Sequence, residues 1–202
     1  MMILPKGNSL LAIQKHLCSS GVEIIRRDSR AYEGVFFVDG VSDKVCFMPA
    51  DLAIWHLETD QAQLIVLGND KWHEADVCDR QRYRLGHFPK SLTRNSVSAH
   101  VAVVGTPESF IKKVKTLITE YPNITRVWCN QQGIHPTIVP VQGGAEAGVI
   151  DDTVMAVCVV ETGTTLKANN LRVVTRLRAA YPIVVVRKDD SRMRQLLQRL
   201  TG

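Results

Sequence analysis

Continuous hydrophobic runs alternate with amphipathic segments along the chain, and this alternation predicts an α/β fold. Apolar runs and alternating segments predict strands, whereas apolar residues at helical spacing predict helices. The predicted strands cover residues 2–4, 22–26, 35–38, 44–48, 64–67, 80–85, 99–105, 127–129, 136–141, 154–160, 171–178 and 183–186. The longer predicted helices cover residues 9–18, 49–57 and 107–120, and a last one follows Ser191.

The segment from Val154 to Asn169 combines a strand, a sharp turn and the start of a helix. The run from Val154 to Val160 has no polar alternation, which predicts a strand buried on both faces. Gly163 permits a tight turn where a Cβ would clash, and Thr164 or Thr165 is expected to cap the helix. Unpaired amides, the helix dipole and hydroxyl groups then form a cradle for a phosphate monoester. An ordinary capped turn is the alternative, since capping threonines are common.

Polar residues also follow other predicted strands, where ligands of α/β folds gather. Lys6 follows the first strand, and either contacts a ligand or is solvated, as most lysines are. Asp70 follows the strand at 64–67, and either binds a substrate hydroxyl or amine or caps a helix. Glu146 follows a glycine-rich turn, and either faces a ligand or is a helix-start glutamate favoured by the dipole.

Composition narrows the class of protein. With 202 residues, 45% of them hydrophobic, the chain is one domain or two small ones, and no apolar run approaches the ~20 residues that span a bilayer. The first residues lack the apolar core of a signal peptide, so we expect a cytoplasmic protein. Five cysteines without a CxxC pair predict free thiols in a reducing compartment. The net charge of +5 is dispersed and only 6% of residues are aromatic, which favours a phosphate-rich small molecule over nucleic acid.

Five segments resemble one enzyme family, in that family's order and spacing. The residues Glu161-Thr162-Gly163-Thr164-Thr165-Leu166-Lys167-Ala168-Asn169-Asn170-Leu171 resemble the signature of ATP phosphoribosyltransferase, the first enzyme of histidine biosynthesis. The other segments are Leu4-Pro5-Lys6-Gly7, Leu67-Gly68-Asn69-Asp70, Glu120-Tyr121-Pro122-Asn123-Ile124-Thr125 and Gly143-Gly144-Ala145-Glu146. Each match is weak alone, but together they cover nearly the whole chain.

The resemblance implies an α/β protein of two lobes, similar to the type II periplasmic-binding-protein fold. The first lobe would comprise residues 1–95 plus 179–202, and the second, residues 96–178, would carry the phosphate loop. The family transfers the 5-phosphoribosyl group of phosphoribosyl pyrophosphate (PRPP) to adenine N1 of ATP, with Mg²⁺, and releases pyrophosphate. The chain resembles the family's short form, which implies a homo-oligomer that works with a separate regulatory subunit.

The resemblance also assigns roles to residues of this sequence. The catalytic residues would be Lys6, Glu146 and Glu161. Lys6 would contact pyrophosphate or the nucleophile, and Glu161 would lie near the ribose hydroxyls. Glu146 and Asp70 would orient the acceptor. The PRPP contacts would be Glu161, Thr162, Gly163, Thr164, Thr165 and Leu166, and the acceptor contacts would be Lys6, Gly7, Asp70 and Gly144.

Four positions depart from the family pattern. Cys158 stands where the family has an acidic residue for the ribose diol, and Asn8, Met48 and Leu117 stand where arginines are expected. Charge-assisted contacts are the strong ones, so their loss weakens binding of an acceptor as charged as ATP. Either the acceptor differs, other arginines compensate, or the chain is a non-catalytic or regulatory paralogue that binds PRPP. A periplasmic solute binder would share the two lobes, but the cysteines and the missing signal sequence disfavour it.

Overall fold

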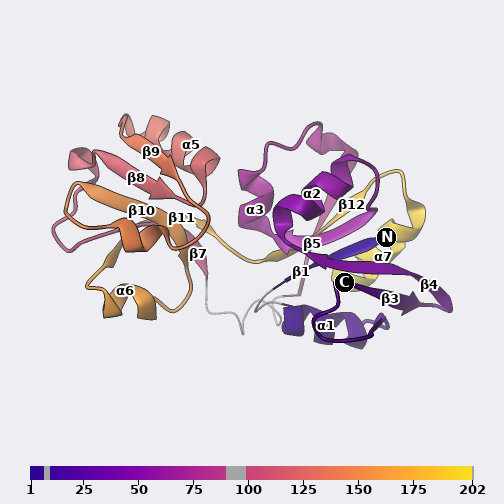
Figure 1. The fold of residues 1–202 in the computed structure, drawn as a ribbon. Coiled ribbons are helices and arrows are strands. Elements are labelled where there is room, and N and C mark those ends of the chain that lie inside the picture. Colours follow the sequence, from indigo (N-terminus) through magenta and orange to yellow (C-terminus); the bar gives the residue numbers. More distant parts are fainter. Residues whose placement is uncertain (7–9, 90–98, 202) are drawn as a thin grey trace. The chain divides into compact units, whose positions relative to one another are not determined.

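The computed structural model describes residues 1–6, 10–89 and 99–201 (Figure 1). The chain divides into two compact units, a first unit of Met1–Asn95 with Pro182–Gly202 and a second unit of Ser96–Tyr181. The return to the first unit follows Tyr181 instead of residue 178, because the last strand of the second unit remains paired with its neighbour through Ala179. None of the described helices is long and apolar enough to span a bilayer.

The first unit is a seven-stranded mixed sheet in the order β2-β3-β4-β1-β5-β12-β6. Its strands are β1 (Met2–Pro5), β2 (Glu23–Arg26), β3 (Glu33–Val38), β4 (Val41–Met48), β5 (Leu64–Gly68), β6 (Tyr83–His87) and β12 (Pro182–Arg187). Its helices are α1 (Leu10–Ser19), α2 (Ala50–Glu58), α3 (Asn69–Glu74), η1 (Arg80–Arg82) and α7 (Ser191–Thr201). β1 runs parallel to both β4 and β5, so the carboxyl ends of these three strands lie at one edge of the sheet.

Helices cover both faces of this sheet. Leu4 of β1 packs in one core with Leu17 of α1 and Leu196 of α7, whereas the neighbouring Ile3 faces the opposite side and is equally buried. In Figure 1, α2 lies on the side of the sheet opposite α1. Two covered faces explain why the strands at 64–67 and 183–186 are continuous apolar runs, as the sequence predicted.

The second unit is a five-stranded sheet in the order β11-β7-β10-β8-β9. Its elements are β7 (His100–Gly105), η2 (Ile111–Lys113), β8 (Thr116–Thr119), α5 (Pro122–Gln132), β9 (Thr137–Pro140), η3 (Ala145–Gly148), β10 (Val154–Val160), α6 (Thr164–Ala168) and β11 (Arg172–Ala179). β10 is the central strand, antiparallel to β7 and parallel to β8. Val157 enters one core and Cys158 the other, which confirms the strand predicted to be buried on both faces.

The helix predicted at 107–120 and the strand predicted at 127–129 are wrong. β8 forms at Thr116–Thr119, where β-branched residues are frequent and every second position is buried. α5 begins at Pro122. Pro122 lies two residues beyond the helix predicted at 107–120, but proline is equally suited to the first helical position, where its missing N–H costs nothing. The strand predicted at 80–85 also begins later, at Tyr83, because residues 80–82 form η1.

Candidate functional site

The loop between β10 and α6 turns at Gly163, which has the left-handed φ of 72°. The space around a Cβ at this position is empty to 4 Å, so the turn requires glycine for its backbone conformation and not to avoid a clash. The expected threonine cap is wrong, since Thr164 and Thr165 already lie in the first turn of α6. Gly163 occupies the cap position and has no side chain with which to bind the helix N-terminus.

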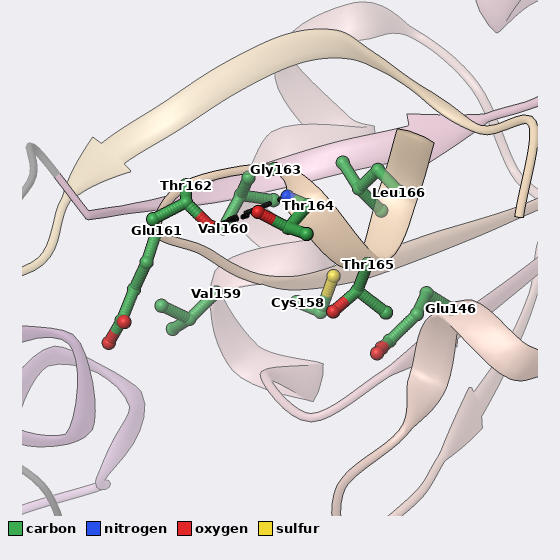
Figure 2. A pocket seen from close by; sticks show the side chains of 10 residues that line it. All are labelled: Glu146, Cys158, Val159, Val160, Glu161, Thr162, Gly163, Thr164, Thr165 and Leu166. Atoms are coloured by element: carbon green, nitrogen blue, oxygen red, sulfur yellow. Dashed lines mark hydrogen bonds between the residues drawn. The ribbon is translucent and has the colours of Figure 1, made fainter. Parts of the chain in front are cut away.

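The Thr162 hydroxyl binds an N–H group at the start of α6, as the expected threonine cap would have done. Its Oγ1 lies 2.9 Å from Oγ1 of Thr164 and accepts the Thr164 N–H at 3.4 Å (Figure 2). Glu161, Thr162, Thr164 and Thr165 are all exposed or half-exposed, whereas Leu166 is buried and anchors α6 to the sheet. The loop is therefore folded on itself, with its hydroxyl groups open to solvent.

Backbone N–H groups of this loop are also available to bind a ligand. Within the described part of the chain, the N–H groups of Gly163, Thr165 and Leu166 have no hydrogen-bond acceptor. α6 has only five residues, so its dipole contributes little, and the donors themselves provide the attraction for an anion.

These residues line a pocket of about 220 Å³. The lining consists of Glu146, Cys158, Val159, Val160, Glu161, Thr162, Gly163, Thr164, Thr165 and Leu166 (Figure 2). Glu146 enters from η3, which follows Gly143 and Gly144 at φ 91° and 67°. The structure thus brings together the whole predicted phosphate loop and Glu146, whereas Gly144 precedes η3 and does not line the pocket.

Cys158 adds an uncharged group to this pocket. Burial, followed by the negative charges of Glu146 and Glu120, raises the pKa of the thiol to about 12. The thiol therefore stays protonated at neutral pH and does not replace a carboxylate electrostatically. No local pattern connects Glu120 with this site, because it follows β8, a strand that was predicted as helix.

The other predicted site residues, Lys6, Gly7 and Asp70, belong to the first unit. Every residue that lines the pocket belongs to the second unit. Lys6 follows β1 and is exposed, with Nζ 3.5 Å from the ring centroid of Tyr32, a contact that no local pattern predicts. Asp70 is buried in the first turn of α3, and a Cβ on Gly68 would collide with its carboxylate. Both residues follow strands that end at the same sheet edge. Gly7 and Asn8 lie outside the described residues.

The oxygen donors of the pocket fit the metal that the resemblance implied. Among residues 1–6, 10–89 and 99–201, no cluster of three or more histidine, cysteine or acidic side chains forms a metal cage. Mg²⁺ is commonly held by one or two carboxylates together with substrate phosphates and water. Glu146 and Glu161 offer carboxylates, and the threonine hydroxyls are hard oxygen donors of the same kind.

The chain is similar to known proteins of one family. A family model, "HisG: ATP phosphoribosyltransferase", matches residues 49–202. The ATP phosphoribosyltransferase of Thermotoga maritima is 30% identical over 191 residues, which covers 92% of this chain and 83% of the relative. That of Anoxybacillus flavithermus is 25% identical over 210 residues, covering 98% and 92%.

Solved structures show the fold. The ATP phosphoribosyl transferase (HisG:HisZ) complex from Thermotoga maritima matches with a TM-score of 0.74 at 22% identity, covering 98% of this chain and 95% of that chain. The periplasmic domain of BvgS from B. pertussis matches with a TM-score of 0.53 at 15% identity, covering 100% and 39%. The predicted α/β fold of the ATP phosphoribosyltransferase type is therefore confirmed.

Proposed function

Because the chain belongs to the ATP phosphoribosyltransferase family, a family of pentosyltransferases, we propose that it transfers the 5-phosphoribosyl group of PRPP to a heteroaromatic nitrogen and releases pyrophosphate. The proposed acceptor is adenine N1 of ATP, in the first step of histidine biosynthesis. The observation that carries the proposal is the loop at residues 161–166, where N–H groups without an acceptor among the described residues lie with exposed hydroxyls beside an open pocket.

The pocket suits one end of the donor. Its volume of about 220 Å³ is below the ~300–1,000 Å³ of sites that enclose a drug-sized ligand, so it would hold the ribose 5-phosphate and leave the pyrophosphate outside. Hydrogen bonds from the Thr162, Thr164 and Thr165 hydroxyls and from free N–H groups would bind the phosphate oxygens. The exposed carboxylate of Glu161 would accept hydrogen bonds from the ribose hydroxyls.

Catalysis would consist of positioning and charge stabilisation, because negative charge develops on the departing pyrophosphate. Lys6, with the Gly7 amide, would contact the pyrophosphate or the incoming nucleophile. Glu146, Asp70 and Gly144 would orient the acceptor ring. Mg²⁺, when bound, would supply positive charge to the pyrophosphate oxygens.

Three observations favour a second candidate, an enzyme with another acceptor or a paralogue that binds PRPP without turnover. Cys158 is an uncharged thiol where the family has an acid. Leu117 is fully buried in the core beneath α5, so the position expected to supply an arginine serves packing in this chain. Met48 ends β4 half-buried and likewise carries no charge.

We further propose a homo-oligomer that works in the cytoplasm with a separate regulatory subunit. The Thermotoga maritima neighbour is described as a HisG:HisZ complex, which supports such a partner for this chain.

The proposal is tested by two measurements on the purified chain. Pyrophosphate release is followed with PRPP, Mg²⁺ and a panel of acceptors that includes ATP, adenosine and free heteroaromatic bases, with and without a candidate regulatory subunit. PRPP binding is measured separately by calorimetry. Release with ATP supports the first candidate, and release with another acceptor only, or binding without release, supports the second. Absence of PRPP binding contradicts both.

A further inference from the structure

Arg176 in the edge strand β11 lies on the same face of its sheet as the phosphate-loop pocket. β7 lies between β10 and β11, and its residue Ala102 pairs with Cys158 on one side and with Arg176 on the other. Residues paired across strands point to the same face, and on this face Ala102 and Cys158 pack with Leu166 of α6. The Arg176 side chain therefore leaves the sheet on the face where Cys158 lines the pocket.

A β-bulge brings Arg176 to this face. The register of β11 against β7 shifts between Val173 and Thr175, so that one extra residue, Val174, is inserted into the strand. Without this insertion Arg176 would pair with Val101, which points into the opposite core. Bulges re-aim side chains in this way and are frequent next to active sites.

His100 fixes the guanidinium group of Arg176. The Arg176 Nε–H donates to Nε2 of His100 at 3.1 Å, so this ring nitrogen is the unprotonated one. His100 begins β7 and pairs with Val160, which ends β10 and lines the pocket. The two terminal nitrogens of Arg176 have no acceptor among the described residues, and the residue is exposed. The guanidinium is thus held one strand away from the end of β10, with its terminal donors available to a ligand.

The pocket itself contributes no positive charge. Its ten described lining residues include the carboxylates of Glu146 and Glu161 and no lysine, arginine or histidine. PRPP carries a diphosphate as well as its 5-phosphate, and charge-assisted hydrogen bonds to such oxygens are the strong ones. Arginine binds phosphate oxygens in pairs through its planar fork. A guanidinium beside the pocket therefore matches the charged part of PRPP that the pocket leaves outside.

We propose that Arg176, held in position by His100, binds the diphosphate oxygens of PRPP that lie outside the phosphate-loop pocket. The inference rests on the proposed transferase function and adds to it a binding residue and a positioning residue beyond the pocket lining. The terminal nitrogens of Arg176 donate to the diphosphate, while the amides and hydroxyls of the loop hold the 5-phosphate. Arg176 then provides positive charge that is missing at Asn8, Met48 and Leu117, where the family resemblance leads us to expect arginines.

The test compares two ligands on the full chain by calorimetry: PRPP with Mg²⁺, and ribose 5-phosphate, which lacks the diphosphate. We expect Arg176→Gln to weaken PRPP binding about 10- to 100-fold, the effect of losing hydrogen bonds to a charged group. Binding of ribose 5-phosphate should not change. Arg178→Gln is the matched control, since Arg178 is also exposed but pairs with Val101 and points to the opposite face. This control should bind both ligands as the native chain does.

Two variants of His100 test the positioning. His100→Leu removes the acceptor of the Arg176 Nε–H and should weaken PRPP binding, whereas His100→Gln keeps an acceptor in its amide oxygen and should retain most of the affinity. Ribose 5-phosphate should bind to both variants as it binds to the native chain, which a general distortion of the loop would not allow. Equal loss of PRPP binding in the two variants would contradict the positioning role.

The outcomes separate this inference from the proposed function. If the native chain binds neither PRPP nor ribose 5-phosphate, the proposed function fails and the inference fails with it. If both ligands bind, the inference is overturned when Arg176→Gln leaves PRPP binding unchanged or weakens both ligands equally. ATP binding is measured in parallel, and a loss confined to ATP would also overturn it. A PRPP loss no larger than that in Arg178→Gln would count against it, because it would reflect only the removal of one positive charge.

Discussion

The thiol of Cys158 and the carboxylate of Glu146 line the same pocket, where burial and then the Glu146 charge raise the pKa of the thiol to about 12. Since the thiolate is the reactive form, Cys158 should resist alkylation at pH 8 although it borders an open pocket. The exposed Cys18 and Cys78 should react with iodoacetamide at least tenfold faster. Peptide mapping by mass spectrometry measures the three rates. Comparable rates would show that the pocket contains a thiolate.

The same pKa predicts a loss of stability in alkaline solution. The thiol ionises near 9 in the unfolded chain and near 12 in the folded one. Because ionisation favours the unfolded chain, the free energy of unfolding falls as pH rises from 9 towards 12. The free energy of unfolding of the native protein should therefore fall faster from pH 8 to 10 than that of Cys158→Ser, which has no ionising group there. Parallel curves from urea titrations would contradict the prediction.

Gly163 and Gly133 form a matched pair that separates backbone strain from function. Both have left-handed φ, at 72° and 64°, and a Cβ added to either residue would meet no atom within 4 Å. Alanine at either position should lower the free energy of unfolding by about 1–2 kcal/mol, the cost of placing a Cβ in this conformation. Only Gly163→Ala should weaken PRPP binding, because the loop donors then shift, whereas Gly133→Ala should bind normally. Calorimetric measurement of PRPP binding to the two variants tests this difference.

Local signals explain why the phosphate loop could be predicted from the sequence and its neighbours could not. The run from Val154 to Val160, Gly163 and the threonines are contiguous, so periodicity and turn chemistry locate the strand, the turn and the helix together. Pro122 is ambiguous in sequence because it either ends a helix or starts one, and the tertiary packing of α5 on the sheet decides.

Contacts between distant segments carry no local signal at all. The charge of Glu120 on Cys158 and the ring of Tyr32 beside Lys6 both depend on how strands and helices meet. Family resemblance identified Glu146 as a site residue, but only the structure shows it in the same pocket as the loop.

Thr162 holds the loop in shape through its hydroxyl, which contacts both the hydroxyl and the N–H of Thr164. Thr162→Val removes these contacts and one donor to the phosphate, so PRPP binding should weaken about tenfold or more. Stability should change little because the residue is exposed. Thr137→Val on the exposed face of β9 is the control and should bind PRPP as the native chain does. Equal PRPP affinities of the two variants would show that Thr162 does not contribute to PRPP binding.

A buried pair of hydroxyls supports the turn that carries Glu120. Oγ1 of Thr119 lies 2.8 Å from Oγ1 of Thr125 and accepts the Tyr121 N–H at 2.9 Å, and the Thr125 hydroxyl donates to the Tyr121 carbonyl at 2.7 Å. Both threonines are fully buried. Thr119→Val deprives the Tyr121 N–H and the Thr125 hydroxyl of this partner, so it should lower the free energy of unfolding by about 1–3 kcal/mol.

The double variant gives the sharper test of this pair. Thr119→Val with Thr125→Val removes both hydroxyls, so neither leaves the other unsatisfied, and its loss should be smaller than the sum of the two single losses. Urea denaturation of the native chain, Thr119→Val, Thr125→Val and the double variant gives the four free energies of unfolding from which the coupling between the two hydroxyls is calculated. Strictly additive losses would mean that the two hydroxyls act separately, and the turn before α5 would then owe its geometry to Pro122 and the packing of Tyr121 instead.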